Sequence, residues 1–163
     1  MSVSTLQIRP IHIEDNQQIA KVIRSVLVDL GVPKVGTAYE DESLDFMYEY
    51  YHKPKHQYFV IEKNQEIYGG AGIAPLENGD QHICELQKMY FLEEARGKGL
   101  GIQMIEVCLA FAKQSGFQQC YLETMPYMTA AQSLYKKVGF RLISKPLGNT
   151  GHYSCPVWML KDL

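Results

Sequence analysis

The sequence has 163 residues, a formal net charge of −2 and a hydrophobic share of 46%. This length corresponds to roughly one domain of about 150 residues, and the composition is typical of a soluble globular protein. The charge argues against a nucleic-acid-coating protein, and no apolar run approaches the roughly 20 residues that span a bilayer. Residues 1–5 contain neither a basic cluster nor an apolar stretch, so we expect no export signal, a cytoplasmic location and a single domain over residues 1–163.

Apolar spacing and turn residues predict eleven elements. Residues such as Ile19, Val22, Ile23 and Val26, at i, i+3, i+4 and i+7, indicate helices. In chain order we expect a strand over 6–9, helices around 19–26 and 44–51, strands over 58–61, 67–74 and 82–91, a helix from 100 to 115, a strand over 120–124, a helix around 131–138, and strands over 140–143 and 157–160. Glycines in the 67–74 strand indicate a close backbone neighbour. This order is neither strictly alternating nor segregated, and it predicts an α/β (α+β) fold with a mixed sheet flanked by helices.

The cysteine pattern predicts reduced thiols. Cys84, Cys108, Cys120 and Cys155 are widely spaced and form no C-x-x-C pair. His152 and Cys155 have the only metal-like spacing, and no neighbouring residues complete a set of four ligands. We therefore expect neither a disulfide framework nor a metal site.

A glycine-rich loop, residues 96–101, stands between a predicted strand and a predicted helix. Its spacing does not match the dinucleotide pattern G-x-G-x-x-G, because Ile102 stands where the third glycine is required, and no P-loop pattern is present. Exposed amides before a helix N-terminus suit a phosphate or pyrophosphate, and Arg96 and Lys98 add positive charge. A tight turn with two solvated cations is the alternative interpretation.

Arg96, Gly99 and Gly101 form the pattern Arg-x-x-Gly-x-Gly, which resembles the acetyl-CoA motif of the GCN5-related N-acetyltransferase (GNAT) family. The resemblance extends over segments 85–91, 122–126 and 134–140. It implies the acyl-CoA N-acyltransferase (GNAT) fold, with a mostly antiparallel central sheet, and it implies acetyl-CoA as the cosubstrate.

In members of that family two neighbouring strands part, and the pantetheine arm of the cofactor lies in the gap. By this resemblance, backbone groups of Met89, Tyr90 and Phe91 pair with the arm as an added strand would. The implied pyrophosphate-binding residues are Arg96, Gly97, Lys98, Gly99, Leu100 and Gly101. Lys136 and Lys137 are further candidate cations for a cofactor that carries about four negative charges.

The resemblance also implies two catalytic residues. Glu85 matches the position of a family glutamate that acts as general base, and the alternatives are Glu123 or water. Strand alternation places Glu85 on the face of Met89 and Phe91, about 13 Å from Met89 at roughly 3.3 Å per residue. Tyr135 matches the family tyrosine that donates to the leaving sulfur, and a core aromatic is the alternative interpretation.

The acceptor is expected to be a primary amine of a small molecule or peptide that attacks the thioester directly. The acidic and aromatic segment 39–51 can form a wall that favours a cationic amine, or it can be a solvated amphipathic helix. The polar segment 148–155 can close over the acceptor, with His152 as a base, a ligand or an ordinary loop residue. A non-catalytic acyl-CoA sensor is the alternative function. We expect no nucleic-acid or membrane partner, and a homodimer is possible through edge strands near the C-terminus.

Overall fold

The computed structural model describes residues 5–163, and residues 1–4, on which part of the export-signal prediction rests, lie outside the described residues. The order of strands and helices predicted from the sequence is confirmed. The elements are β1 (Gln7–Pro10), α1 (Asn16–Asp29), α2 (Met47–Tyr51), β2 (Gln57–Lys63), β3 (Glu66–Pro75), β4 (Ile83–Phe91), α3 (Leu100–Gln114), β5 (Gln119–Thr124), α4 (Thr129–Lys137), β6 (Arg141–Ile143) and β7 (Val157–Asp162). No described helix has both the length and the apolar character that a bilayer crossing requires.

The strands form a seven-stranded sheet in the order β1-β2-β3-β4-β5-β7-β6. Only β4 and β5 are parallel neighbours, and all other neighbours are antiparallel. A parallel pair needs a crossover connection, and α3 supplies it. The predicted mixed, mostly antiparallel sheet is therefore confirmed.

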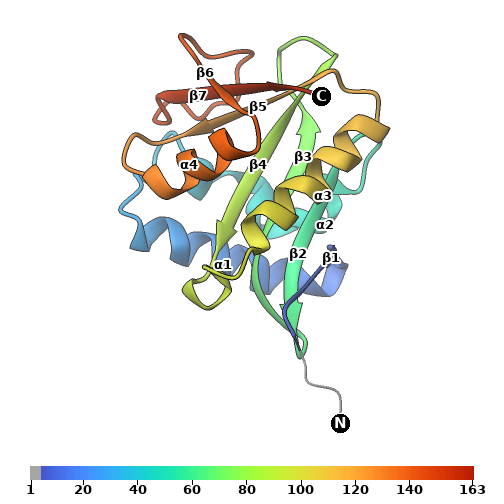
Figure 1. Ribbon diagram of the computed structural model, residues 1–163. Helices are drawn as coiled ribbons and strands as arrows, with labels where there is room; N and C mark the ends of the chain where they lie inside the picture. Colours follow the sequence, from blue (N-terminus) through green and yellow to red (C-terminus); the bar gives the residue numbers. More distant parts are fainter. Residues whose placement is uncertain (1–4) are drawn as a thin grey trace.

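Helices cover both faces of the sheet (Figure 1). On one face α3 packs with Met104, Ile105 and Cys108, and α4 adds Tyr135 to the same core. On the other face α1 and α2 bury Ile19 and Met47 among other apolar side chains. Because the two cores are separate, each face of the sheet can carry its own hollow.

The second predicted helix is shorter than its apolar stripe. Residues Glu42–Phe46 form a 3-10 turn, and only Met47–Tyr51 are α-helical. Phe46 has a non-helical backbone conformation, with φ −134°. The side-chain oxygen of Asn16 accepts a hydrogen bond from the Tyr48 backbone N–H at 2.8 Å. A side chain from α1 thus caps α2 and sets its start, which the spacing of residues 44–51 does not encode.

The glycines of β3 have the close neighbour that the sequence indicates. A Cβ on Gly72 would lie 2.6 Å from Cδ2 of the buried Tyr58, so this position accepts no side chain without a shift. The Tyr58 ring occupies the space over β3, and its hydroxyl donates to the Lys88 carbonyl at 2.8 Å.

A β-bulge in β4 changes which face its residues occupy. Gly70 pairs with Tyr90 and Gly72 pairs with Gln87, so β4 carries one extra residue, and Lys88 adopts φ +49°. Met89 and Phe91 pack on the α3 side, whereas Glu85 is the partner of Ala74, which faces α1 and α2. The expectation that Glu85 shares a face with Met89 and Phe91 is therefore wrong, because the extra residue reverses the alternation between them.

Candidate functional site

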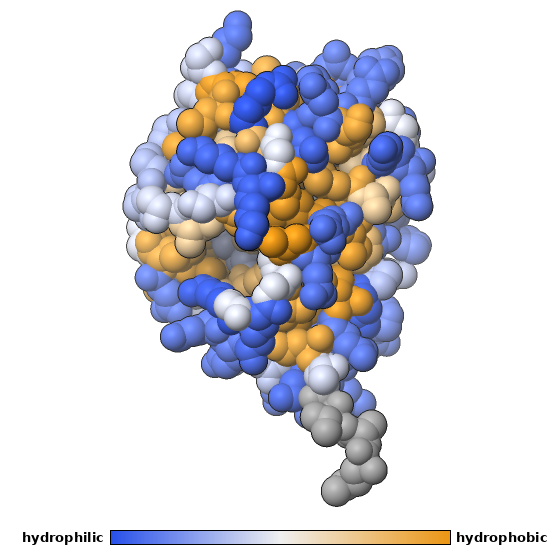
Figure 2. Space-filling view, in the orientation of Figure 1, coloured by the Kyte–Doolittle hydropathy of each residue, from blue (hydrophilic) through white to orange (hydrophobic). Residues whose placement is uncertain are grey.

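Strands β4 and β5 part soon after they meet. They pair only from Ile83 to Glu85 against Gln119 to Tyr121. Beyond this point a cleft of about 550 Å³ opens between β4, the glycine-rich loop, the end of β5 and α4, and we call it the donor cleft. Figure 2 shows the cleft as a hollow between the surfaces of α1 and α4. Past Glu85, no strand among residues 5–163 pairs with the β5-facing edge of β4, so an extended chain could pair with it.

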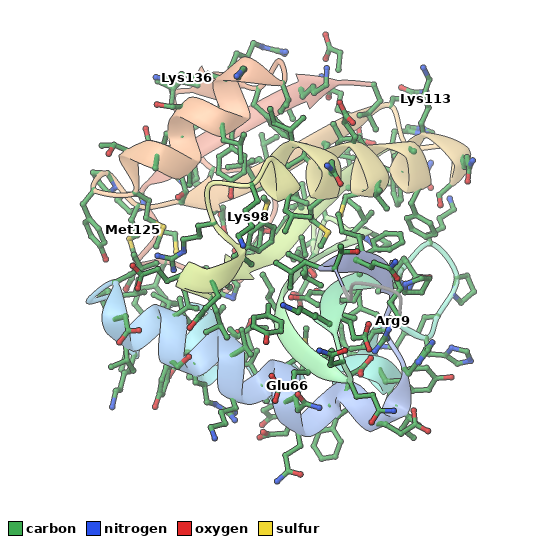
Figure 3. The ribbon with its side chains drawn as sticks, turned by 60° about the horizontal axis from the view of Figure 1, so that its bottom comes forward. Arg9, Glu66, Lys98, Lys113, Met125 and Lys136 are labelled. Atoms are coloured by element: carbon green, nitrogen blue, oxygen red, sulfur yellow. The ribbon has the colours of Figure 1, made fainter. Side chains whose placement is uncertain are left out.

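Most of the predicted cofactor-binding residues line this cleft. Those that do are Met89, Tyr90, Phe91, Arg96, Gly97, Gly99 and Gly101. Leu100 and Lys98 are not part of the cleft lining. The side chain of Leu100 is buried in the core, and the exposed Lys98 lies beside the start of α3 (Figure 3). Lys136 and Lys137 belong to the last turn of α4 and are also outside the cleft lining.

The glycine-rich loop depends on its glycines for backbone conformation. Gly97 and Gly99 have φ values of +72° and +78°, which side chains with a Cβ rarely adopt. Gly99 caps the N-terminus of α3, where the first amides have no acceptor within the helix. The Arg96 Nε donates to the Phe91 carbonyl at 2.9 Å and holds the guanidinium beside these amides. The arrangement suits a pyrophosphate.

Tyr135 lies in the donor cleft on the side of α4. Its side chain is buried, and burial raises the pKa of the phenol to about 12. The Phe140 ring packs against it edge-on at 6.0 Å between centroids. The phenol therefore stays protonated at neutral pH and can donate a hydrogen bond into the cleft.

A second hollow, of about 630 Å³, lies between segment 41–53, strand β4 and the tail residues Thr150 and His152, and we call it the acceptor pocket. Its lining residues are Asp41, Glu42, Ser43, Phe46, Glu49, Tyr50, Lys53, Glu77, Glu85, Gln87, Lys88, Thr150 and His152. Five of them are acidic and two are lysines, so the pocket favours positive charge. The acidic segment 39–51 and the tail segment 148–155, which the sequence singles out separately, thus line one hollow.

Glu85 lies at the base of the acceptor pocket with only 3% of its surface exposed. Burial raises the pKa of this carboxyl to about 7, although a hydrogen bond from Gln87 acts in the opposite direction. Gln87 Nε2 donates to Glu85 Oε1 at 2.6 Å, and the Tyr51 hydroxyl donates to Gln87 Oε1 at 2.6 Å. A carboxyl with this pKa exchanges a proton readily near neutral pH.

Asp41 joins three segments that are distant in sequence. Its Oδ2 lies 2.9 Å from His152 Nε2 and 3.2 Å from Lys88 Nζ. Burial acts to raise the pKa of Asp41, but the hydrogen bond from His152 and the charge of Lys88 hold it below its ordinary value. Burial likewise acts to lower the pKa of His152, and Asp41 outweighs it and raises that pKa. His152 is therefore part of an ionic cluster and not an isolated loop residue.

Glu85, Glu123 and His152 offer ligand atoms within 4.8 Å of one another, a set that could hold a metal ion. The Glu123 carboxylate, however, already accepts hydrogen bonds from Tyr121 at 2.7 Å and from Thr150. Glu85 accepts a hydrogen bond from Gln87, and His152 forms a hydrogen bond with Asp41. The structure thus shows each of these three groups in a hydrogen bond with another side chain.

Lys88 connects the two hollows, since it lines both the donor cleft and the acceptor pocket. The sequence reasoning gives no individual role to Gln87 or Lys88, and it includes Asp41 and Tyr51 only as members of the acidic and aromatic segment 39–51. Two of them leave a signal in the sequence, because Gln87 and Lys88 are polar residues in a mostly apolar strand. Their partners Tyr51 and Asp41 come from another segment, and only the fold brings them together.

The comparisons agree with this architecture. The model of the acetyltransferase (GNAT) family matches residues 24–140. The uncharacterized N-acetyltransferase YjgM of Escherichia coli (strain K12) is 44% identical over 156 residues, which cover 95% of this chain and 93% of that protein. The chain therefore belongs to the GNAT acetyltransferase family, an acyltransferase class whose cosubstrate is acetyl-CoA.

Solved structures show the same fold. A GNAT-family acetyltransferase from Staphylococcus aureus Mu50 superposes with a TM-score of 0.86 at 20% identity, covering 98% of this chain and 99% of that chain. YncA from Salmonella typhimurium, solved with acetyl-CoA, superposes with a TM-score of 0.78 at 18% identity, covering 98% and 95%.

Proposed function

We propose that this N-acetyltransferase transfers the acetyl group of acetyl-CoA to a primary amine of a cationic small molecule or peptide by direct attack on the thioester. The observation that carries the proposal is the meeting of two hollows at Lys88, one suited to an extended cofactor and the other acidic. The continuous sheet of the described residues supports one catalytic domain over residues 1–163. A cytoplasmic location and a homodimer through edge strand β6 stay predictions.

In this proposal the cofactor occupies the donor cleft. Its arm pairs with the free edge of β4 at Met89, Tyr90 and Phe91, and its pyrophosphate meets the amides of residues 97–101. A backbone amide near Phe91 donates to the tetrahedral oxyanion. The β4 bulge supports this role, because an extra residue leaves backbone groups outside the ladder with β3.

Glu85 is the proposed base. An alkylamine with a pKa near 10.4 is only about 0.04% neutral at pH 7, so its proton must be removed before attack. Glu85 takes that proton directly or through water and passes it to solvent. The neutral nitrogen then bonds to the thioester carbon, its second proton goes to water, and the carbon–sulfur bond breaks as the amide forms. Glu123 is less suited to this role because Tyr121 and Thr150 already donate to its carboxylate.

Tyr135 is the proposed donor to the departing thiolate. Its pKa of about 12 lies more than three units above that of a thiol near 8.5, so the phenol stays protonated when the sulfur carries charge. It then donates a hydrogen bond to the thiolate and keeps its own proton, and the thiolate takes a proton from solvent water. The acidic pocket lining and the Tyr50 ring favour a positively charged acceptor.

The test is mass spectrometry of the purified protein for bound acetyl-CoA, followed by a thiol-release assay with a panel of amines. We expect co-purified cofactor and faster release with diamines and basic peptides than with neutral or acidic amines. A protein that binds coenzyme A but frees no thiol with any amine would instead be a sensor. A protein without affinity for coenzyme A would contradict the whole proposal.

A further inference from the structure

Three side chains from two elements form a hydrogen-bonded row that ends in the wall of the acceptor pocket. Tyr51 comes from α2, and Gln87 and Glu85 come from β4. Tyr51 donates to Gln87 Oε1, and Gln87 Nε2 donates to Glu85 Oε1, each at 2.6 Å. Glu85 and Gln87 both line the acceptor pocket, whereas Tyr51 does not, so the row runs from the α2 core to the pocket wall.

The direction of the row follows from Tyr51. This phenol is fully buried, and burial raises its pKa well above the ordinary value, so it keeps its proton. Because it donates to the carbonyl of Gln87, the amide nitrogen of Gln87 turns toward Glu85. An N–H donor stabilises a carboxylate relative to the carboxylic acid. The row therefore favours the ionised form of Glu85, which burial alone disfavours.

We propose that Gln87 is a positioning residue for acetyl transfer: with its amide oriented by Tyr51, it fixes the Glu85 carboxylate as the base that faces the acceptor pocket. The inference rests on the proposed function. Gln87 lines the same pocket as Glu85, and the role assigned to it here acts through its hydrogen bond to the Glu85 carboxylate.

Other ionisable groups also face Glu85, from every neighbouring element. They are Asp41, Tyr50, Tyr51, Glu77, Lys88, Tyr90, Cys120, Tyr121, Glu123, His152 and Cys155. Among them Glu123 acts to raise the pKa of Glu85, and His152 and Lys88 act to lower it. Among the described residues, Gln87 is the neutral side chain that donates directly to this carboxylate, so its removal changes one contact without changing a charge.

The test is a carbon-13 NMR titration of the Glu85 carboxyl, assigned by its loss in Glu85→Gln. We compare the wild type with Gln87→Met, which removes the amide, and Tyr51→Phe, which removes only the hydroxyl. Gln87→Met should move the titration upward by about one pH unit and Tyr51→Phe by about half a unit. The acidic limb of kcat/KM for the amine should move by the same amounts. Tyr48→Phe is the matched control, because Tyr48 stacks on His52 away from the row, and it should move neither.

An unchanged Glu85 titration in both Gln87→Met and Tyr51→Phe would overturn the inference. A shift of equal size in Tyr48→Phe would also overturn it, because the effect would then not belong to the row. The titration needs no turnover, so it separates this inference from the proposed function. If no amine is acetylated by the wild type, the proposed function fails whatever the titration shows.

Discussion

The donor cleft and the acceptor pocket are built differently, although β4 contributes residues to both. The donor cleft uses mainly backbone: an unpaired strand edge and the glycine-dependent start of α3. The acceptor pocket uses side chains from distant segments, joined through Asp41, Lys88 and His152. A backbone site tolerates change at most side chains but not at its glycines, whereas a side-chain site can be retuned one residue at a time.

The largest effect is expected on the acceptor side. Glu85→Gln should lower turnover by about 100- to 10,000-fold, because it removes the base. In the wild type, kcat/KM for the amine should fall about tenfold for each pH unit below about 7, where Glu85 becomes protonated. Steady-state kinetics across pH 5–9 measure both. Glu123→Gln serves as control, and an equal loss in that variant would transfer the role to Glu123.

On the donor side, Tyr135→Phe should slow turnover by about 10- to 1000-fold and leave acetyl-CoA affinity nearly unchanged. The ring remains packed against Phe140, so only the donor to the thiolate is lost. Calorimetry with coenzyme A and turnover at saturating substrate separate the two effects. Turnover equal to that of the wild type would remove Tyr135 from the mechanism.

Gly99→Val tests whether the loop backbone holds the cofactor. A valine at φ +78° forces the loop to rearrange, and we expect coenzyme A affinity to fall about 10- to 100-fold through lost amide contacts. Gly116→Val carries a similar strain at φ +90° beyond the far end of α3. If both variants lose affinity equally in calorimetry, the loss comes from reduced stability and not from the loop.

Asp41→Asn should act on acceptor binding. Without this carboxylate, the charge of Lys88 is no longer neutralised and repels a cationic amine, while burial then lowers the pKa of His152 and favours its neutral form. We expect KM for the amine to rise about tenfold with a smaller change in kcat, at low ionic strength. Asp45→Asn removes an exposed carboxylate paired with Arg24 and should leave KM unchanged. A kcat loss without a KM change would place Asp41 outside acceptor recognition.

Glu85 also affects stability, and this effect has the opposite sign to its effect on activity. The pKa of Glu85 is about 7 in the folded protein and near 4.5 in an unfolded chain, so folding favours its protonated form. That stabilisation is present below about pH 4.5 and is lost as the pH rises through 7. Relative to the wild type, Glu85→Gln should therefore gain about 3 kcal/mol of unfolding free energy between pH 4 and pH 8. Urea denaturation at both pH values measures the gain, and no gain would mean that Glu85 is not buried as described.

Much of the fold could be predicted from the sequence, because its signals are local. Apolar spacing and turn residues identify the strands and helices in their correct order, and Gly97 and Gly99 mark a loop that no other residue suits. The start of α2 was not predictable in this way, because Asn16 of α1 decides it. The β4 bulge was also missed: period-two alternation assumes an unbroken ladder, and Lys88 interrupts it.

By itself the sequence determined the order of elements, the glycine loop and a set of candidate residues that includes Glu85 and Tyr135. Backbone conformation and helical periodicity depend on neighbours along the chain, so they leave a readable pattern. The tertiary structure alone decided that Glu85 faces away from Met89, that Gln87 and Tyr51 form a hydrogen-bonded row with it, and that Asp41 meets His152 across 111 positions. Hydrogen bonds and ion pairs depend on the distance between side chains in the folded protein. The separation of two residues along the chain does not determine that distance.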